Sequence, residues 1–193
     1  MLCRLAPEKG VDIGVESINL ALSALSPEQR KRVRVIIAGD GPLRKQVEED
    51  IHRRELSETC LLWGEASRSE VVSLLGISDI FLHTSTRGAY YTLSILEAMA
   101  STCAVVASTQ PSLNVQLLAE GRGLVVPAGD AEQTAQALLR VINDPELRRQ
   151  MGNLARDYIA VNHSGTKLRR VLMQATYWSA LDQFVHGGME GER

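Results

Sequence analysis

The chain has 193 residues, of which 45% are hydrophobic and only 4% aromatic, and its formal net charge is −2. That length suits one domain of ordinary size or one lobe of a two-lobed protein, with a core of aliphatic side chains. The near-neutral charge gives no reason to expect nucleic acid or an anionic membrane as a partner, and no apolar run approaches the roughly 18–20 residues that span a bilayer.

Apolar runs bounded by turn residues predict six strands that alternate with helices. The first strand is a stub, residues 1–6, which suggests that the chain begins partway through an element and that a longer parent lies upstream. The other strands are expected at 33–38, 60–63, 80–85, 104–107 and 123–127. Helices are expected over 12–25, 43–51, 67–75, 93–100, 113–118, 130–143, 147–158 and 168–181.

This alternation predicts an α/β fold, a doubly wound parallel sheet of about six strands of the Rossmann-like type. Residues 1–185 are expected to form one domain, and the Gly-rich residues 186–193 a disordered tail. Right-handed crossovers bring the loops that follow the strands to one edge of such a sheet, where ligands bind.

The stretch 80–107 is the centre of the prediction, because it places a loop and a helix N-terminus at that edge. The positive end of the helix dipole and its free N–H groups favour a phosphate there. Glu97 lies about one turn inside the helix and could accept hydrogen bonds from a hydroxylated ligand. The alternative is structural, because Ser94-x-x-Glu97 also fits a capping box.

Cations precede the first helix. Arg4 and Lys9 lie in the loop that follows the stub, and they could bind a diphosphate, Arg as a fork and Lys as a point charge. Taken alone, they are better explained as two solvated surface charges, and a helix N-terminus across the same crevice is what favours a binding role. Gly39-x-Gly41 after a strand is a weak dinucleotide-binding signal, because Arg44 stands where the third glycine should be.

The cysteines and histidines indicate no metal or proton-transfer site. Cys3, Cys60 and Cys103 are odd in number and widely spaced, which favours free thiols, a reducing compartment and a cytoplasmic protein. Neither His83 nor His163 has an evident orienting partner in the sequence, so no catalytic residue is assigned. No metal and no cofactor are expected.

Several blocks resemble, in their order, the C-terminal, donor-binding lobe of retaining GT-B glycosyltransferases of family 4, the glycosyl transferases group 1. The resemblance covers nearly the whole chain and rests on blocks at residues 3–10, 36–43, 63–64, 78–85, 96–100 and 121–130.

The resemblance implies roles for individual residues. Arg4 and Lys9 correspond to the residues that bind the donor diphosphate, and backbone groups around Leu93 and Ser94 approach the phosphates. Glu97 corresponds to the second Glu of the Glu-x7-Glu motif, which holds the nucleotide ribose. The loop after Trp63 and Gly64 lies beside the base.

The chain also departs from the family pattern. Ala89 stands where the first Glu of the motif should contact the transferred sugar, and Tyr90-Tyr91-Thr92 replaces the usual Gly-Phe-Gly. The family also has an N-terminal lobe that binds the acceptor, which would have to come from a missing segment or a partner chain.

Two functions are therefore expected. The first is a glycosyltransferase donor-binding lobe that takes a nucleotide-diphosphate sugar and needs the missing lobe for transfer. The second is a non-catalytic binding or scaffold module derived from such a lobe. A dinucleotide-dependent oxidoreductase is a distant third, because the three-glycine fingerprint is incomplete.

Overall fold

The computed structural model describes residues 1–87, 93–110 and 112–163. The chain divides into two compact units, Met1–Arg156 and Asp157–Arg193. The expected helix at 168–181 and the tail at 186–193 lie outside the described residues, as does Ala89.

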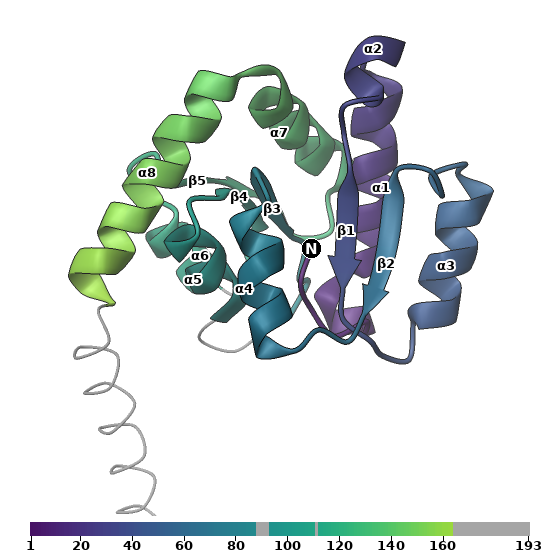
Figure 1. The fold of residues 1–193 in the computed structure, drawn as a ribbon, viewed down its shortest axis with the longest axis horizontal. Helices are drawn as coiled ribbons and strands as arrows, with labels where there is room; N and C mark the ends of the chain where they lie inside the picture. Colours follow the sequence, from purple (N-terminus) through teal and green to yellow (C-terminus); the bar gives the residue numbers. More distant parts are fainter. Residues whose placement is uncertain (88–92, 111, 164–193) are drawn as a thin grey trace, which may run out of the picture. The chain divides into compact units, whose positions relative to one another are not determined.

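Strands and helices alternate through the first unit, as predicted (Figure 1). The strands are β1 (Val35–Ala38), β2 (Cys60–Gly64), β3 (Ile80–His83), β4 (Ala104–Ser108) and β5 (Gly123–Val126). The helices are η1 (Pro7–Lys9), α1 (Val11–Ser23), α2 (Pro27–Arg30), α3 (Arg44–Arg53), α4 (Arg68–Gly76), α5 (Leu93–Ala100), α6 (Leu113–Leu117), α7 (Ala131–Asn143) and α8 (Pro145–Asn162).

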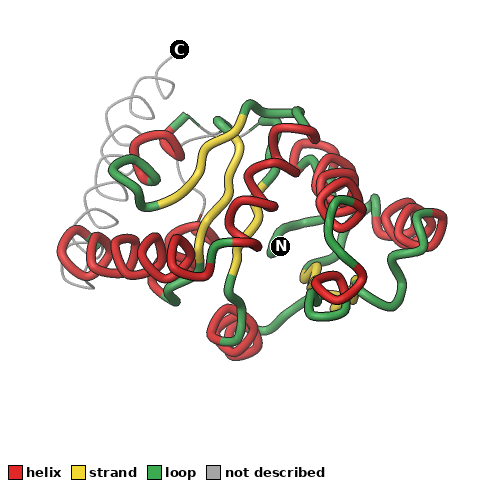
Figure 2. The backbone as a smooth tube through the Cα atoms, turned by 90° about the horizontal axis from the view of Figure 1, so that it is seen from above, coloured by secondary structure: helices red, strands yellow, loops and turns green. Residues whose placement is uncertain are grey.

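All strand pairs are parallel, which confirms the predicted fold class. The strands form two hydrogen-bonded sheets, β1-β2 and β3-β4-β5, and Figure 2 shows the second as three strands side by side. The first predicted strand contributes one isolated bridge between Leu2 and Ala38, parallel to β1. Within the described residues, the strands therefore do not form one continuous six-stranded sheet.

The core is largely aliphatic, as the composition predicts. β4 is buried along its whole length, and α5 and α7 both pack against it, so the three-stranded sheet is covered on both faces. The large side chains most completely shielded from solvent include Leu5, Ile37, Ile95 and Met99. Burying each such side chain contributes about 1.5–3 kcal/mol to stability.

Several helix ends follow from local sequence signals. Ser67 and Glu70 form the predicted capping box of α4, and Asp130 caps α7 by accepting a hydrogen bond from the Gln133 amide at 2.8 Å. Asp12, expected as a cap, instead lies in the first turn of α1. Its place at the N-cap is taken by Gly10, which has the left-handed φ of 56°.

Residues 157–163 are the described part of the second unit. They continue α8 to Asn162, and the rings of Tyr158 and His163 lie 5.7 Å apart between centroids. No helix in the described part of the chain is long and apolar enough to cross a membrane.

Candidate functional site

The loop of residues 4–10 is fixed near its start by backbone hydrogen bonds. The Leu5 amide donates to Asp40 O at 2.9 Å, and the Leu43 amide donates to Leu5 O at 3.0 Å. This holds the loop against the turn that follows β1. Arg4, next to Leu5, is exposed, and its role in binding a diphosphate stays a prediction.

The same loop is joined to the segment that follows β3. The amides of Thr86 and Arg87 donate to Glu8 O at 3.0 and 3.3 Å, and the Thr84 hydroxyl donates to Lys9 O at 3.2 Å. At Gly10, an added Cβ would lie 2.3 Å from Thr84 O. Lys9 is therefore held beside the loop that leads into α5.

Beneath Lys9, the buried end of β3 carries His83. Its Nε2 lies 3.1 Å from Ser85 Oγ, while its Nδ1 has no partner among the described residues. Burial and, to a lesser extent, the positive charge of Lys9 together lower the pKa of His83 to about 4. The imidazole is thus neutral near pH 7.

Helix α5 carries the three residues expected to approach the ribose and the phosphates. Leu93 and Ser94 are its first two residues, so their amides belong to the turn that lacks intrahelical partners. Because α5 begins at Leu93, Ser94 lies inside the helix and is not its N-cap, so Ser94 and Glu97 do not form a capping box despite their spacing. Instead, the Glu97 carboxylate accepts a hydrogen bond from the Arg68 guanidinium.

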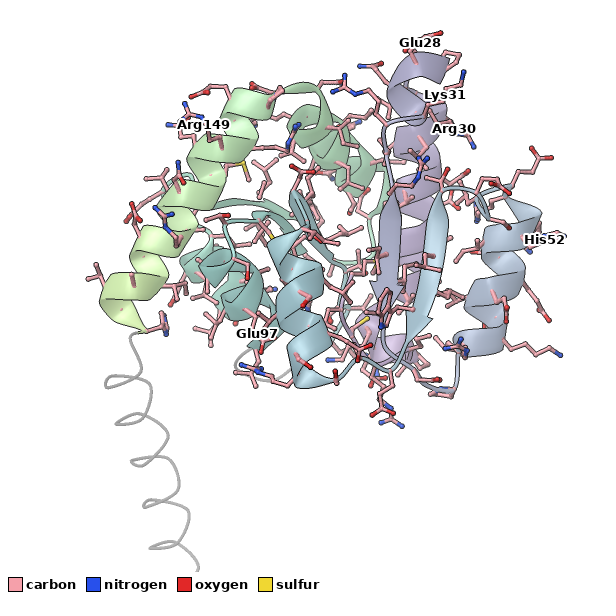
Figure 3. The ribbon with its side chains drawn as sticks, viewed as in Figure 1. Glu28, Arg30, Lys31, His52, Glu97 and Arg149 are labelled. Carbon is pink, nitrogen blue, oxygen red and sulfur yellow. The ribbon has the colours of Figure 1, made fainter. Side chains whose placement is uncertain are left out.

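Arg68 is the first residue of α4, and it was not among the residues predicted from the sequence. Its side chain is 78% exposed, whereas that of Glu97 is 23% exposed. Figure 3 shows Glu97 beside the end of α4 where that helix begins. No sequence signal could have found this pair, because 29 residues separate its members and only the packing of α4 on α5 joins them.

The loop predicted to lie beside the base follows β2, and it contacts the turn that follows β1. Gly64, with φ of 89°, accepts a 2.6 Å hydrogen bond through its carbonyl from the Gly39 amide. Trp63 leaves 40% of its surface exposed, an unusual position for so large an apolar side chain. It is available for stacking against a planar ring.

Four loops are thus connected at the carboxyl ends of the strands: 4–10, 39–43, 63–67 and 84–87. Arg4, Lys9, Trp63 and Gly64 lie on these loops or directly beside them, and Arg68 connects Glu97 to the third. Arg4 and Lys9 both lie on the first of these loops, where they could face an anionic ligand.

Comparison with known proteins gives a consistent result. Residues 1–158 match the family described as Glycosyl transferases group 1. The alpha-D-kanosaminyltransferase of Streptomyces kanamyceticus is 30% identical over 162 residues, which cover 83% of this chain and 40% of that protein. A GDP-mannose-dependent mannosyltransferase of Corynebacterium glutamicum, acting on a monoacylated phosphatidylinositol monomannoside, is 25% identical over 181 residues, 88% of this chain and 45% of that protein.

Solved structures share the fold at low sequence identity. Anabaena Alr3699/HepE in complex with UDP and glucose superposes with a TM-score of 0.77 at 20% identity, covering 91% of this chain and 47% of that one. The C-terminal domain of the group 1 protein LpcC from Francisella tularensis gives 0.72 at 22% identity, covering 83% and 82%. The chain spans less than half the length of these curated relatives.

Proposed function

Because this chain belongs to the glycosyl transferases group 1 family, we propose that its first unit binds the nucleoside-diphosphate sugar from which a glycosyl group is transferred. The fold is the Rossmann-like fold of GT-B glycosyltransferases, as the superposed structures indicate. Within that fold we assign the chain to the C-terminal lobe of a retaining, family 4 enzyme.

The observation that carries the proposal is the joining of the four loops by backbone hydrogen bonds. They hold Lys9 beside residues 84–87, which come before α5 in the chain. Two kinds of positive charge, a side chain and a helix N-terminus, are thereby supplied to one anionic group.

The residues have distinct roles in this proposal. Arg4 and Lys9 bind the diphosphate together with the amides of Leu93 and Ser94, and Glu97 accepts hydrogen bonds from the ribose hydroxyls. Trp63 and Gly64 lie beside the base. As the sugar leaves, the same cations stabilise the negative charge that develops on the diphosphate, without a metal ion.

Transfer itself needs a second lobe that binds the acceptor, from a further segment of polypeptide or a partner chain. That the chain spans less than half of its relatives supports this part of the proposal. The cytoplasmic location stays a prediction, supported by the three free cysteines.

Isothermal titration with UDP, GDP and ADP tests the donor site. We expect one of them to bind weakly, and we expect Arg4→Ala or Lys9→Ala to weaken that binding by about 1.5–3 kcal/mol, the range for hydrogen bonds to charged groups. Arg30→Ala and Lys31→Ala are the matched controls, because Arg30 ends α2 and Lys31 is its C-cap, both far from Glu97 (Figure 3). No binding of any nucleotide at millimolar concentration would contradict the donor site.

One sequence feature favours the alternative, a binding or scaffold module without transfer. Ala89 replaces the Glu that contacts the transferred sugar in the family, so the sugar loses a partner. A scaffold should bind the nucleoside diphosphate as tightly as the corresponding nucleotide sugar, whereas a donor site that holds the sugar should bind the nucleotide sugar more tightly. Titrating both ligands decides between the two functions.

A further inference from the structure

Four polar side chains are buried together at the carboxyl ends of β3 and β4. Each residue is at most 4% exposed, and hydrogen bonds join them in a chain: His83, Ser85, Ser108 and Asn114. His83 ends β3, Ser108 ends β4, and Asn114 lies in the first turn of α6. We call this set the buried polar cluster. None of its members is among the residues proposed to touch the nucleotide.

The hydrogen bonds of the cluster run from α6 to the segment that follows β3. The Asn114 side-chain amide donates to the carbonyls of Ser108 and Gln110, both at 3.0 Å. The Ser108 hydroxyl donates to Ser85 O at 2.6 Å, and Ser85 Oγ lies 3.1 Å from His83 Nε2. The cluster therefore connects the start of α6 with the segment after β3.

The segment after β3 also carries the contacts with the first loop. The Thr84 hydroxyl donates to Lys9 O at 3.2 Å, and the Thr86 amide donates to Glu8 O at 3.0 Å. Ser85 lies between Thr84 and Thr86, and its carbonyl is held by the cluster. A shift of Ser85 would move both contacts, because the backbone is continuous through all three residues. The position of Lys9 is thus linked to the cluster.

Stability alone does not account for a polar cluster at this place. His83 Nδ1 and Asn114 Oδ1 are buried without a hydrogen-bond partner among the described residues. Such atoms are unfavourable away from water, so aliphatic side chains of similar size would fill the space at a lower free energy. Hydrogen bonds have direction, however, whereas aliphatic contacts do not. A polar cluster therefore fixes one arrangement of the segments that it joins.

We propose that the buried polar cluster positions residues 84–86 and, through them, Lys9 for binding of the donor diphosphate. Its members are positioning residues, because they contact one another and the main chain rather than the ligand. The ligand in this proposal rests on the proposed donor site, whereas the link between the cluster and the first loop is a property of the ligand-free chain. Breaking the central hydrogen bond of the cluster should loosen the first loop and weaken diphosphate binding while β4 stays folded.

Ser108→Ala removes the hydroxyl that bridges the ends of the two strands, and Ser17→Ala is its matched control. Ser17 is also fully buried, and its hydroxyl also donates to a carbonyl at 2.6 Å, that of Ile13, but this bond stays within α1. The first readout is amide hydrogen exchange in the ligand-free chain, measured for Thr86 relative to Val106 in the buried strand β4. We expect this exchange ratio to rise at least about fivefold in Ser108→Ala and to stay unchanged in Ser17→Ala.

The second readout is the affinity for pyrophosphate, measured by calorimetry. We expect Ser108→Ala to weaken binding about three- to tenfold, the effect of one lost hydrogen bond, and Ser17→Ala to leave it unchanged. No pyrophosphate binding by the unchanged chain would overturn the donor site. An exchange ratio that is equal in Ser108→Ala, Ser17→Ala and the unchanged chain would overturn the role of the cluster. The two failures are therefore distinguishable.

A double-mutant cycle tests the path of this coupling. Asn114→Ala should raise the exchange ratio by itself but add little to the effect of Ser108→Ala, because Asn114 is proposed to act through Ser108. Additive effects of the two substitutions would overturn that path. Asn114→Ala also decides the question alone if Ser108→Ala does not fold, because it removes the hydrogen bond that holds Ser108 from the side of α6. An unchanged exchange ratio in that variant would then overturn the proposal.

Discussion

At the scale of single residues, His83 shows how the fold changes the chemistry of a side chain. It is 4% exposed, and its burial and the Lys9 charge both disfavour the imidazolium form. The sequence predicted that His83 would be structural because no partner orients it. In the structure its partner is Ser85, two residues along the same strand end, which is a local contact.

The lowered pKa of His83 predicts that the protein loses stability in mild acid. The unfolded chain protonates its histidine near pH 6.5, whereas folded His83 protonates near pH 4, so stability is full above pH 6.5 and falls as the pH drops toward 4. The loss is about 3 kcal/mol for this residue. Urea unfolding at pH 7 and 4.5 measures it, and His83→Gln should lose less stability over that interval than the unchanged protein.

His52→Gln is the control for that measurement. His52 is exposed on α3, so its substitution should leave the difference between pH 7 and 4.5 unchanged. If His83→Gln were as acid-sensitive as the unchanged protein, the buried neutral histidine would not be the cause.

The pairing of Arg68 with Glu97 predicts competition with a nucleotide ribose. The pair is largely exposed on the Arg side and should contribute less than about 1 kcal/mol to folding, so Arg68→Ala should barely change the unfolding midpoint. It should free the Glu97 carboxylate for ribose hydroxyls. We expect the ratio of UDP affinity to pyrophosphate affinity to rise by up to about fivefold. Loss of the Arg68 charge should weaken both ligands equally and so cancel in this ratio, whereas only UDP has a ribose that gains from the freed carboxylate.

Calorimetry with both ligands gives this ratio directly. Glu97→Gln should lower the same ratio, because the carboxylate is the proposed ribose partner. A ratio unchanged in both variants would mean that Glu97 does not contact the ribose.

At the scale of elements, the turn at Gly10 holds the first loop against the end of β3. The 2.3 Å approach of an added Cβ to Thr84 O leaves no room for a side chain, and the φ of 56° disfavours one. Gly10→Ala should lower the free energy of unfolding by about 3 kcal/mol, from left-handed strain plus the clash. Chemical denaturation measures this loss.

Gly129→Ala is a matched control for that substitution. Gly129 also has a positive φ, 83°, but an added Cβ meets no atom within 4 Å. We expect it to lower the free energy of unfolding by about 1 kcal/mol, the backbone strain alone. Equal losses in the two variants would show that contact with Thr84 is not what makes Gly10 necessary.

Most elements could be predicted because their signals are local. The capping signals at Ser67 and Asp130 and the β-branched run before Gly39 describe segments that need little help from distant residues. α2 was missed because Ser26-Pro27 was interpreted as a break. In the structure Ser26 caps a helix of four residues, with Pro27 in its first turn.

At the scale of the whole molecule, the arrangement of the strands was less predictable than their positions. Alternating strands and helices imply a parallel sheet, but the hydrophobic pattern alone does not say whether a short first strand joins the other strands into one sheet. The contact between Arg68 and Glu97 and the attachment of Glu8 to Thr86 likewise depend on how distant segments pack. The role of Ala89, outside the described residues, stays a prediction.

The loops at the carboxyl ends of the strands are fastened to one another mainly through main-chain amides and carbonyls, such as those of Leu5, Glu8 and Gly39. Main-chain contacts persist when a side chain is exchanged, provided that the glycines at the tightest approaches remain. Residues such as Trp63 and Arg68 can therefore mutate freely without unfastening the loops. Single substitutions in descendants of this chain could therefore change the preferred ligand while the loops keep their positions. Ligand preference could then evolve independently of the stability of the fold.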